Sequence, residues 1–159
     1  MKTFRSALFV AAAVLSLAFA GCGGIKPGGI TETLVAFHAT DASLAESRAT
    51  LSVRYANENI SALGFSGATH SLYLNGTYVG KVASKQPFGI PPMNATTQDV
   101  TVQLENVALV RQLIAVGGAQ TAAYRLESVL SQTINEDNYE YKVNAQGAVD
   151  LHADAPAAK

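Results

Sequence analysis

The sequence predicts an all-β domain with one short helix. Polar and apolar side chains alternate over short stretches, and this period of two is typical of strands that bury one face. Turn-forming residues bound these stretches, and Asn75-Gly76 is the dipeptide that most strongly favours a two-residue hairpin. The hydrophobic content of 48% is too high for a chain that is disordered throughout.

The alternation locates the strands one after another. In the segment 51–55, for example, Leu51, Val53 and Tyr55 face one side and the polar residues between them face the other. Residues 146–147, Gln-Gly, predict a turn before the last strand. The strands expected in this way cover residues 33–39, 51–55, 72–74, 77–82, 100–104, 124–131, 139–143 and 148–151.

One segment has the period of a helix. Between Asn106, which can cap its start, and Gly117, which can end it, residues 107–116 carry apolar side chains at helical spacing. The same stripe suits a helix that closes one end of a β core or a helix that lies on a membrane. Because the segment lacks a charged face, we expect it to pack on the core.

The first 21 residues have the pattern of an export signal. Lys2 and Arg5 precede an uncharged apolar stretch at 6–19. Its length matches the ~7–15 residues of a secretory signal and is short of the ~20 that cross a bilayer as a helix. Residues 17–22, LAFAGC, resemble a bacterial lipobox, in which the cysteine is acylated after cleavage. Cys22 is the single cysteine and has no internal disulfide partner; ordinary cleavage leaving a free thiol is the alternative.

These features divide the chain into four parts: a lipoprotein signal peptide at 1–21, a flexible tether at 22–30, a β domain at 31–152 and a loose tail at 153–159. The tether, CGGIKPGGI, has four glycines and one proline and too few apolar side chains to fold. Acyl chains on Cys22 would attach the domain to a membrane without spanning it. Gly23 resembles the residue that follows the cysteine in outer-membrane lipoproteins, so we expect a cell-envelope protein at the outer membrane that faces the periplasm.

The charge of the exported part argues against nucleic acid as a partner. Without residues 1–21 the chain has 138 residues and a net charge of −3, from nine Lys and Arg against twelve Asp and Glu. It contains no basic run, which binding to phosphates would require. A chain of this length forms one domain with a core large enough to need no disulfide.

The histidines predict no metal site. His38, His70 and His152 are far apart in sequence, and none has a second ligand type at a metal-binding spacing. We interpret His38 and His70 as polar residues on strand edges. We expect neither a metal nor another cofactor.

Two further stretches lack the features of a catalytic site. GFSG at 64–67 lacks the five-residue frame and the strand-turn-helix context of a hydrolase nucleophile, so we interpret it as a loop. Glu136 and Asp137 are adjacent carboxylates, but the surrounding segment is polar and would not raise the pKa of either group. The sequence therefore predicts a protein that is not an enzyme.

The stretch VRYANEN at 53–59 ends a strand on two asparagines. Asparagine side chains bond nearby backbone groups and tolerate left-handed conformations, so Asn57 and Asn59 predict a corner of the fold and not a reactive site.

The order of the segments resembles a known family. LSVRYANENISALGFSG is followed by THSLYLNGTYVGKV, FGIPPMNATTQDVTVQL, the helix, AAYRLESVLSQ and EYKVNAQGAVDL. This order resembles the water-stress and hypersensitive-response (WHy) domain of group 2 late-embryogenesis-abundant proteins. Asn57 and Asn59 match the family's Asn-Pro-Asn, with Glu58 in place of proline, and Asn75-Gly76 matches its hairpin. The resemblance implies an immunoglobulin-like or fibronectin III-like β-sandwich of about seven strands and a role in stress protection without catalysis.

The expected function combines these inferences. A lipid-anchored envelope protein would protect proteins or the membrane surface during desiccation, cold or heat, with stress-labile proteins as clients. The alternative is an envelope interaction module that binds one protein, lipid or glycan partner. The oligomeric state is not predicted.

Overall fold

The computed structural model describes residues 28–115 and 120–152. The predicted signal peptide, Cys22, Gly117 and the C-terminal tail lie outside these residues.

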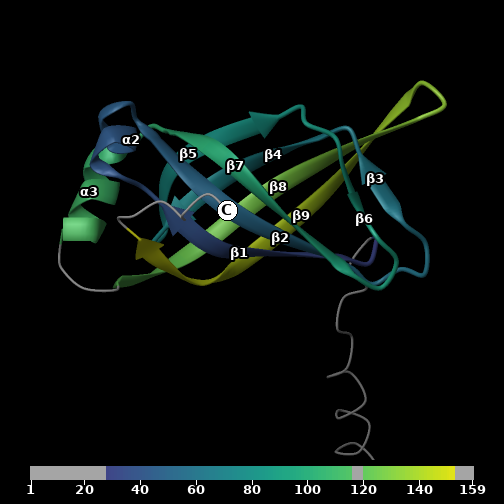
Figure 1. Ribbon diagram of the computed structural model, residues 1–159, viewed down its shortest axis with the longest axis horizontal. Helices are drawn as coiled ribbons and strands as arrows, with labels where there is room; N and C mark the ends of the chain where they lie inside the picture. The colour runs from purple at the N-terminus through teal and green to yellow at the C-terminus, as the bar shows by residue number, and fades with distance from the viewer. Residues whose placement is uncertain (1–27, 116–119, 153–159) are drawn as a thin grey trace, which may run out of the picture.

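Seven strands form a closed barrel in the order β1-β2-β7-β5-β4-β8-β9, and two more strands form a small separate sheet (Figure 1). The barrel strands are β1 (Ile30–His38), β2 (Arg48–Asn57), β4 (Gly67–Leu74), β5 (Thr77–Ser84), β7 (Ala95–Leu104), β8 (Gln120–Ile134) and β9 (Asp137–His152). The small sheet pairs β3 (Leu63–Phe65) with β6 (Phe88–Ile90).

The expected immunoglobulin-like or fibronectin III-like sandwich is therefore wrong. The two sheets of a sandwich have free edges, whereas here the first and last strands of the barrel pair with each other. β1 is antiparallel to β2 and parallel to β9, with Phe37 opposite Leu151 and His38 opposite His152. On the other side of the ring, β5 joins β7 through two residue pairs, Gly80 with Leu104 and Lys81 with Gln103. These short pairings turn one sheet into a barrel.

Inward-facing side chains from all seven strands fill the barrel. Leu51, Val53 and Tyr55 are fully buried, so the predicted inward face of 51–55 is confirmed. The same alternation buries Leu72 and Leu74 of β4. The core therefore lies inside a cylinder and not between two layers.

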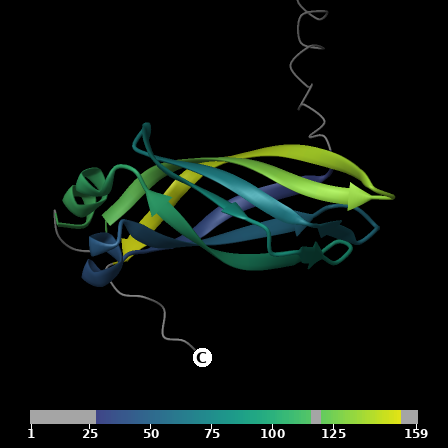
Figure 2. The same cartoon turned by 90° about the horizontal axis from the view of Figure 1, so that it is seen from above.

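Two helices lie together at one end of the barrel, and β3 and β6 lie at the other end (Figures 1 and 2). The predicted helix is confirmed as α3 (Val107–Ala115), and Val110 is fully buried, so this helix packs on the core as expected. A second helix, α2 (Asp41–Ala45), was not expected. Thr40 and Ser43 cap its start reciprocally, and Leu44 is its one buried side chain.

Two tight turns join neighbouring strands. The predicted hairpin between β4 and β5 is confirmed, because Asn75 and Gly76 have φ values of 47° and 79°. Asn135 and Glu136 make the same kind of turn between β8 and β9, with φ values of 49° and 75°. Figure 1 shows this second hairpin projecting beyond the end of the barrel that carries β3 and β6.

The turn expected at 146–147 is wrong, because β9 continues through it without a break. Gly147 lies opposite Tyr124 of β8, and a Cβ there would be 3.1 Å from the tyrosine ring. The glycine leaves room for Tyr124, whose hydroxyl accepts a hydrogen bond of 3.2 Å from the backbone N–H of Leu34 in β1. This bond adds to the junction between the C-terminal strands and β1.

The segment 64–67 is not the expected loop. It contains the end of β3 and the first residue of β4, and the side chain of Phe65 is buried. The phenylalanines Phe65 and Phe88 pack at a centroid distance of 5.3 Å where β3 and β6 meet the barrel.

Candidate functional site

Asn57 and Asn59 lie where β2 leaves the barrel, and their amides hold neighbouring segments together. The buried Asn57 side chain donates from Nδ2 to the backbone carbonyls of Ser61 at 2.8 Å, Pro91 at 3.1 Å and Ile90 at 3.3 Å. Its Oδ1 accepts from the backbone N–H of Asn59 at 2.9 Å and from the side-chain amide of Asn59 at 3.0 Å.

The corner also holds the start of the described chain. Asn59 donates from Nδ2 to the carbonyl of Gly28 at 2.7 Å, and the Glu58 N–H donates to the carbonyl of Gly29 at 2.8 Å. The corner thus joins the entry to β1, the end of β2 and the connection between β6 and β7. Apart from the bond between the two side-chain amides, these contacts are made with backbone groups, which gives the two asparagines a structural role.

Asn75 has a comparable role in its hairpin. Its backbone N–H donates to the carbonyl of Ala123 at 2.8 Å, and its side-chain Oδ1 accepts from the N–H of Ala123 at 3.0 Å. The turn therefore extends the pairing between β4 and β8 by one residue. Gly76 supplies the second positive φ.

A chain of buried polar side chains crosses the barrel, and it was not predicted from the sequence. His70 of β4 is fully buried, so its interpretation as an edge residue is wrong. Its Nδ1 lies 2.7 Å from Ser128 Oγ, and its Nε2 lies 3.0 Å from the hydroxyl of Tyr55. Ser128 donates to Glu32 Oε1 at 2.8 Å. The four residues come from β1, β2, β4 and β8, so the chain links different walls of the barrel.

This group contains the residue types of a serine hydrolase but not their order. In a nucleophilic triad the serine and the acid bind opposite nitrogens of the histidine ring. Here Ser128 and Glu32 both lie on the Nδ1 side, with Glu32 Oε1 at 3.3 Å from Nδ1, and Tyr55 occupies the Nε2 side. The side chains of His70 and Glu32 are also completely inaccessible. The arrangement fits a structural polar network.

Burial fixes the protonation state of one member of this network. Desolvation, with a smaller contribution from the nearby Glu32 carboxylate, raises the pKa of the Tyr55 hydroxyl far above its ordinary value. Tyr55 therefore stays a phenol, able to donate to His70. At the other end of the chain, Glu32 Oε2 is buried and has no hydrogen-bond partner among the described residues.

The alternation of the sequence could have predicted that these polar residues are buried. His70 has the same phase as Leu72 and Leu74 along β4. Ser128 has the same phase as its buried neighbours in β8, Leu126 and Leu130. The prediction assigned apolar residues to the inward face and did not consider that polar residues at the same alternating positions would also be buried.

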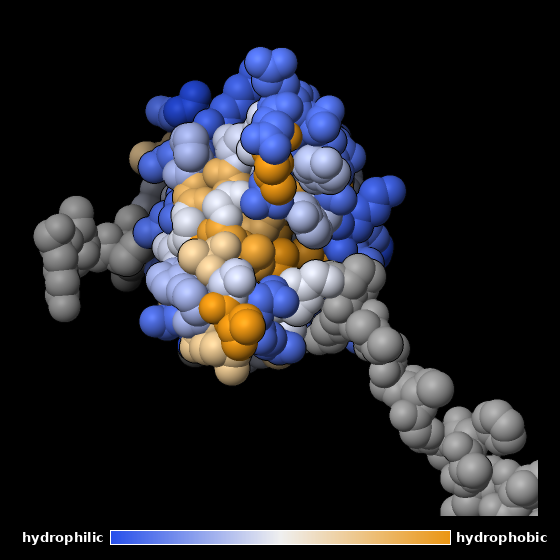
Figure 3. Space-filling model, turned by 90° about the vertical axis from the view of Figure 1, so that its right-hand side faces the viewer, coloured by the Kyte–Doolittle hydropathy of each residue, from blue (hydrophilic) through white to orange (hydrophobic). Residues whose placement is uncertain are grey.

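The barrel end that carries β3 and β6 exposes apolar side chains (Figure 3). Ile60 is 89% exposed and Met93 is 69% exposed, and their loops are joined by a 3.0 Å bond from the Met93 N–H to the Asn59 carbonyl. Ile134 and Tyr139, at the tip of the β8–β9 hairpin, are both nearly half exposed. We call these four residues the apolar end.

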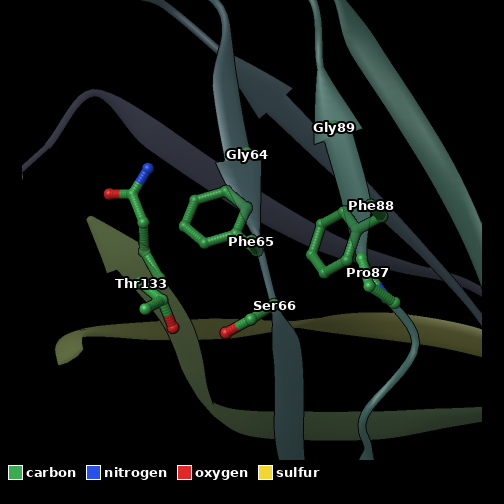
Figure 4. A pocket seen from close by; sticks show the side chains of 8 residues that line it. Gly64, Phe65, Ser66, Pro87, Phe88, Gly89 and Thr133 are labelled. Atoms are coloured by element: carbon green, nitrogen blue, oxygen red, sulfur yellow. The ribbon is translucent and has the colours of Figure 1, made fainter. Parts of the chain in front are cut away.

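A hollow of about 640 Å³ opens beside the hairpin at the apolar end. Phe65, Phe88, Pro87 and Thr133 are among the residues that line it. Figure 4 shows the two phenylalanine rings side by side, with Thr133 facing them from β8. The hollow combines aromatic surface with polar side chains, Gln132 and Thr133 among them, which suits contact with a partner that is partly apolar.

The described residues contain no group of three or more histidine, cysteine or acidic side chains that could hold a metal ion. Glu136 belongs to the hairpin turn and Asp137 begins β9, so the adjacent carboxylates lie at an exposed tip. Neither α2 nor α3 has the length and apolar character that a membrane crossing requires.

Comparison with models of protein families identifies the family of this chain. A family model described as late embryogenesis abundant protein, LEA_2, matches residues 52–148, more than half of the chain. The chain belongs to this family. LEA_2 proteins are in general not enzymes, and the match indicates a stress-related protein of the late embryogenesis abundant type. No curated protein matches the chain.

Solved structures share the fold of this LEA_2 protein. A solution structure of an Arabidopsis thaliana protein is 14% identical, with a TM-score of 0.54 over 80% of this chain and 83% of that one. A second solution structure, of a protein assigned to the late embryogenesis abundant group, is 15% identical, with a TM-score of 0.50 over 93% and 86% of the two chains. At these identities the likeness shows the fold alone.

Proposed function

We propose that this LEA_2 protein is a lipid-anchored, non-enzymatic protein of the cell envelope with a WHy-type domain, which protects other proteins or the membrane surface during water loss, cold or heat. Acyl chains on Cys22 provide the anchor, and the protein faces the periplasm from the outer membrane. Its clients are stress-labile proteins.

The observation that carries the proposal is the family match over residues 52–148. Two features of the structure support it. The polar network that resembles a catalytic group is sealed inside the barrel. The apolar end offers side chains that can cover apolar surface on a damaged neighbour.

The test is to dry or freeze a labile enzyme with this protein. Residues 22–159 carrying Cys22→Ala are mixed with the enzyme, and an equal mass of an inert globular protein serves as the control. We expect more enzyme activity to survive with the LEA_2 protein. Equal survival in both mixtures would count against protection.

The second candidate is an interaction module that binds one envelope partner, and the aromatic hollow beside the hairpin favours it. Cross-linking in intact cells followed by mass spectrometry separates the two functions. An interaction module gives one stoichiometric partner, whereas a protective protein gives many unrelated ones.

A further inference from the structure

The apolar end and the start of the described chain lie at the same end of the barrel. Gly28 is bound by Asn59 at 2.7 Å, and a Cβ on Gly28 would lie 3.6 Å from the ring of Tyr141 in β9. Ile60 follows Asn59 directly, and Met93 donates its N–H to the Asn59 carbonyl. The point where the chain enters the barrel is therefore beside the most exposed apolar side chains.

The exposed apolar residues are distributed unevenly. The described part of the chain has five large apolar side chains that are exposed: Val35, Ile60, Met93, Ile134 and Tyr139. Four of them form the apolar end, and Val35, at a bulge in β1, is the exception. The helices α2 and α3 at the opposite end expose no large apolar side chain.

Chain length limits how far this end can be from an anchor. Six residues lead from Cys22 to Gly28, and a fully extended chain spans at most ~3.6 Å per residue, so Cys22 lies within about 22 Å of Gly28. β2 alone has ten residues and is about 33 Å long. An anchor on Cys22 thus holds the apolar end close to the lipid, while the helical end can lie much further away.

We propose that the apolar end rests on the bilayer surface, with Ile60 and Met93 inserted among the lipid headgroups. This inference rests on the proposed anchoring at Cys22 and adds the face that meets the lipid. Large apolar side chains around an anchor point add to membrane attachment in proportion to the apolar area they bury. The α2–α3 end then points away from the membrane.

The charges at this end specify the lipid. The acidic groups at this end outnumber the basic ones: Glu58, Glu136, Asp137 and Glu140 against Arg54 and Lys85. An anionic surface would repel them, and we therefore assign the surface to zwitterionic lipid.

The chain contains no tryptophan, so a single tryptophan can report the position of each end. Ile60→Trp and Met93→Trp place the reporter at the apolar end, and Gln112→Trp places it on an exposed position of α3. The acylated full-length protein of each variant is purified from bacterial membranes and reconstituted into phosphatidylcholine vesicles, with and without brominated lipid. Mass spectrometry establishes the acylation of Cys22.

We expect the emission of the first two reporters to shift to the blue and to be largely quenched by brominated phosphatidylcholine, whereas the Gln112→Trp reporter stays unquenched. Acylated protein with no quenching at Ile60→Trp and Met93→Trp would overturn the orientation and leave anchoring intact. An unmodified Cys22 would overturn anchoring and orientation together. A blue shift without vesicles that grows with protein concentration would assign the apolar end to a second copy of the chain and overturn the proposal.

A second measurement determines how strongly the apolar end binds lipid vesicles when the acyl anchor is absent. In the Cys22→Ala background, Ile60→Asp combined with Met93→Asp should weaken binding to phosphatidylcholine vesicles about tenfold or more, because burial of one large apolar side chain contributes roughly that factor. Val35→Asp is the matched control, since Val35 is exposed away from the apolar end. Equal binding by all three proteins would contradict the proposal.

Discussion

The buried side chain of Asn57 binds three backbone carbonyls and two groups of Asn59. Asn57→Ala leaves these groups without partners in a partly buried corner. We expect it to lower the free energy of unfolding by about 2 kcal/mol, measured as a lower midpoint in urea with an unchanged slope.

The control for this prediction is Asn94→Ala. The side chain of Asn94 makes one exposed contact, to the N–H of Ala95, and its loss should cost less than about 1 kcal/mol. Similar costs at positions 57 and 94 would show that the corner is not held by the Asn57 amide.

Tyr55 predicts how stability changes in alkali. Burial raises its pKa in the folded protein, while in the unfolded chain the hydroxyl loses its proton near pH 10. Above that pH the unfolded state is stabilised by losing a proton that the folded state keeps, so the free energy of unfolding falls as pH rises. Tyr55→Phe removes this contribution, and its unfolding free energy should fall less steeply than that of the wild type when urea melts are compared from pH 8 to about pH 11.

At neutral pH the same variant leaves His70 Nε2 without its partner and should be less stable by about 1 kcal/mol. Tyr139→Phe, at an exposed position, is the control and should keep the wild-type slope. If Tyr55→Phe and the wild type lost stability in parallel, the hydroxyl would not be held protonated by the core.

Among the elements, the backbones of β5 and β7 come very close at Gly80. A Cβ on Gly80 would lie 2.2 Å from the carbonyl oxygen of Gln103, and backbone cannot move aside as a flexible side chain can. Gly80→Ala should destabilise the protein by about 1–3 kcal/mol. Gly64 of β3 has no atom near its Cβ position, so Gly64→Ala should be tolerated. Thermal melts of both variants check the prediction, and equal melting temperatures would contradict it.

The β8–β9 hairpin carries strain at Glu136, whose φ of 75° disfavours a side chain. Glu136→Gly should stabilise the protein by several tenths to about 1 kcal/mol. Lys142→Gly, at an exposed position within β9, should instead destabilise it by about 0.5–1 kcal/mol. Urea melts of the two variants measure both effects, and a loss of stability with Glu136→Gly would refute the strain.

The sequence predicted most elements but not how they are joined. Alternation identified the inward face of β2, and Asn75-Gly76 identified a hairpin, because both signals are local. The helix α2 has only five residues, too few to show a helical period. Gly147 was misread because its role depends on Tyr124, 23 positions earlier in the chain but directly opposite it in the sheet.

At the scale of the whole molecule, the alternation pattern could not predict that the sheet closes into a barrel. A barrel and a sandwich show the same alternation, and the difference lies in pairs such as Phe37 with Leu151, which no local signal reveals. The polar network could not be predicted for the same reason. Glu32 and Ser128 are far apart in the sequence and meet only because β1 and β8 face the same interior. The structural corner at Asn57 and Asn59 was within reach because asparagines at the end of an alternating strand are a local signal. Half of its side-chain hydrogen bonds, however, reach segments more than 30 positions away in the chain.

The proposed function places the barrel at a membrane through Cys22, where it protects its surroundings. Its most direct test is survival after drying of a strain that lacks the gene, complemented by the wild-type protein and by Cys22→Ala, with protein levels matched. We predict that the deletion lowers survival, that the wild type restores it, and that Cys22→Ala does not. A deletion strain that survives drying as well as its parent would contradict the account.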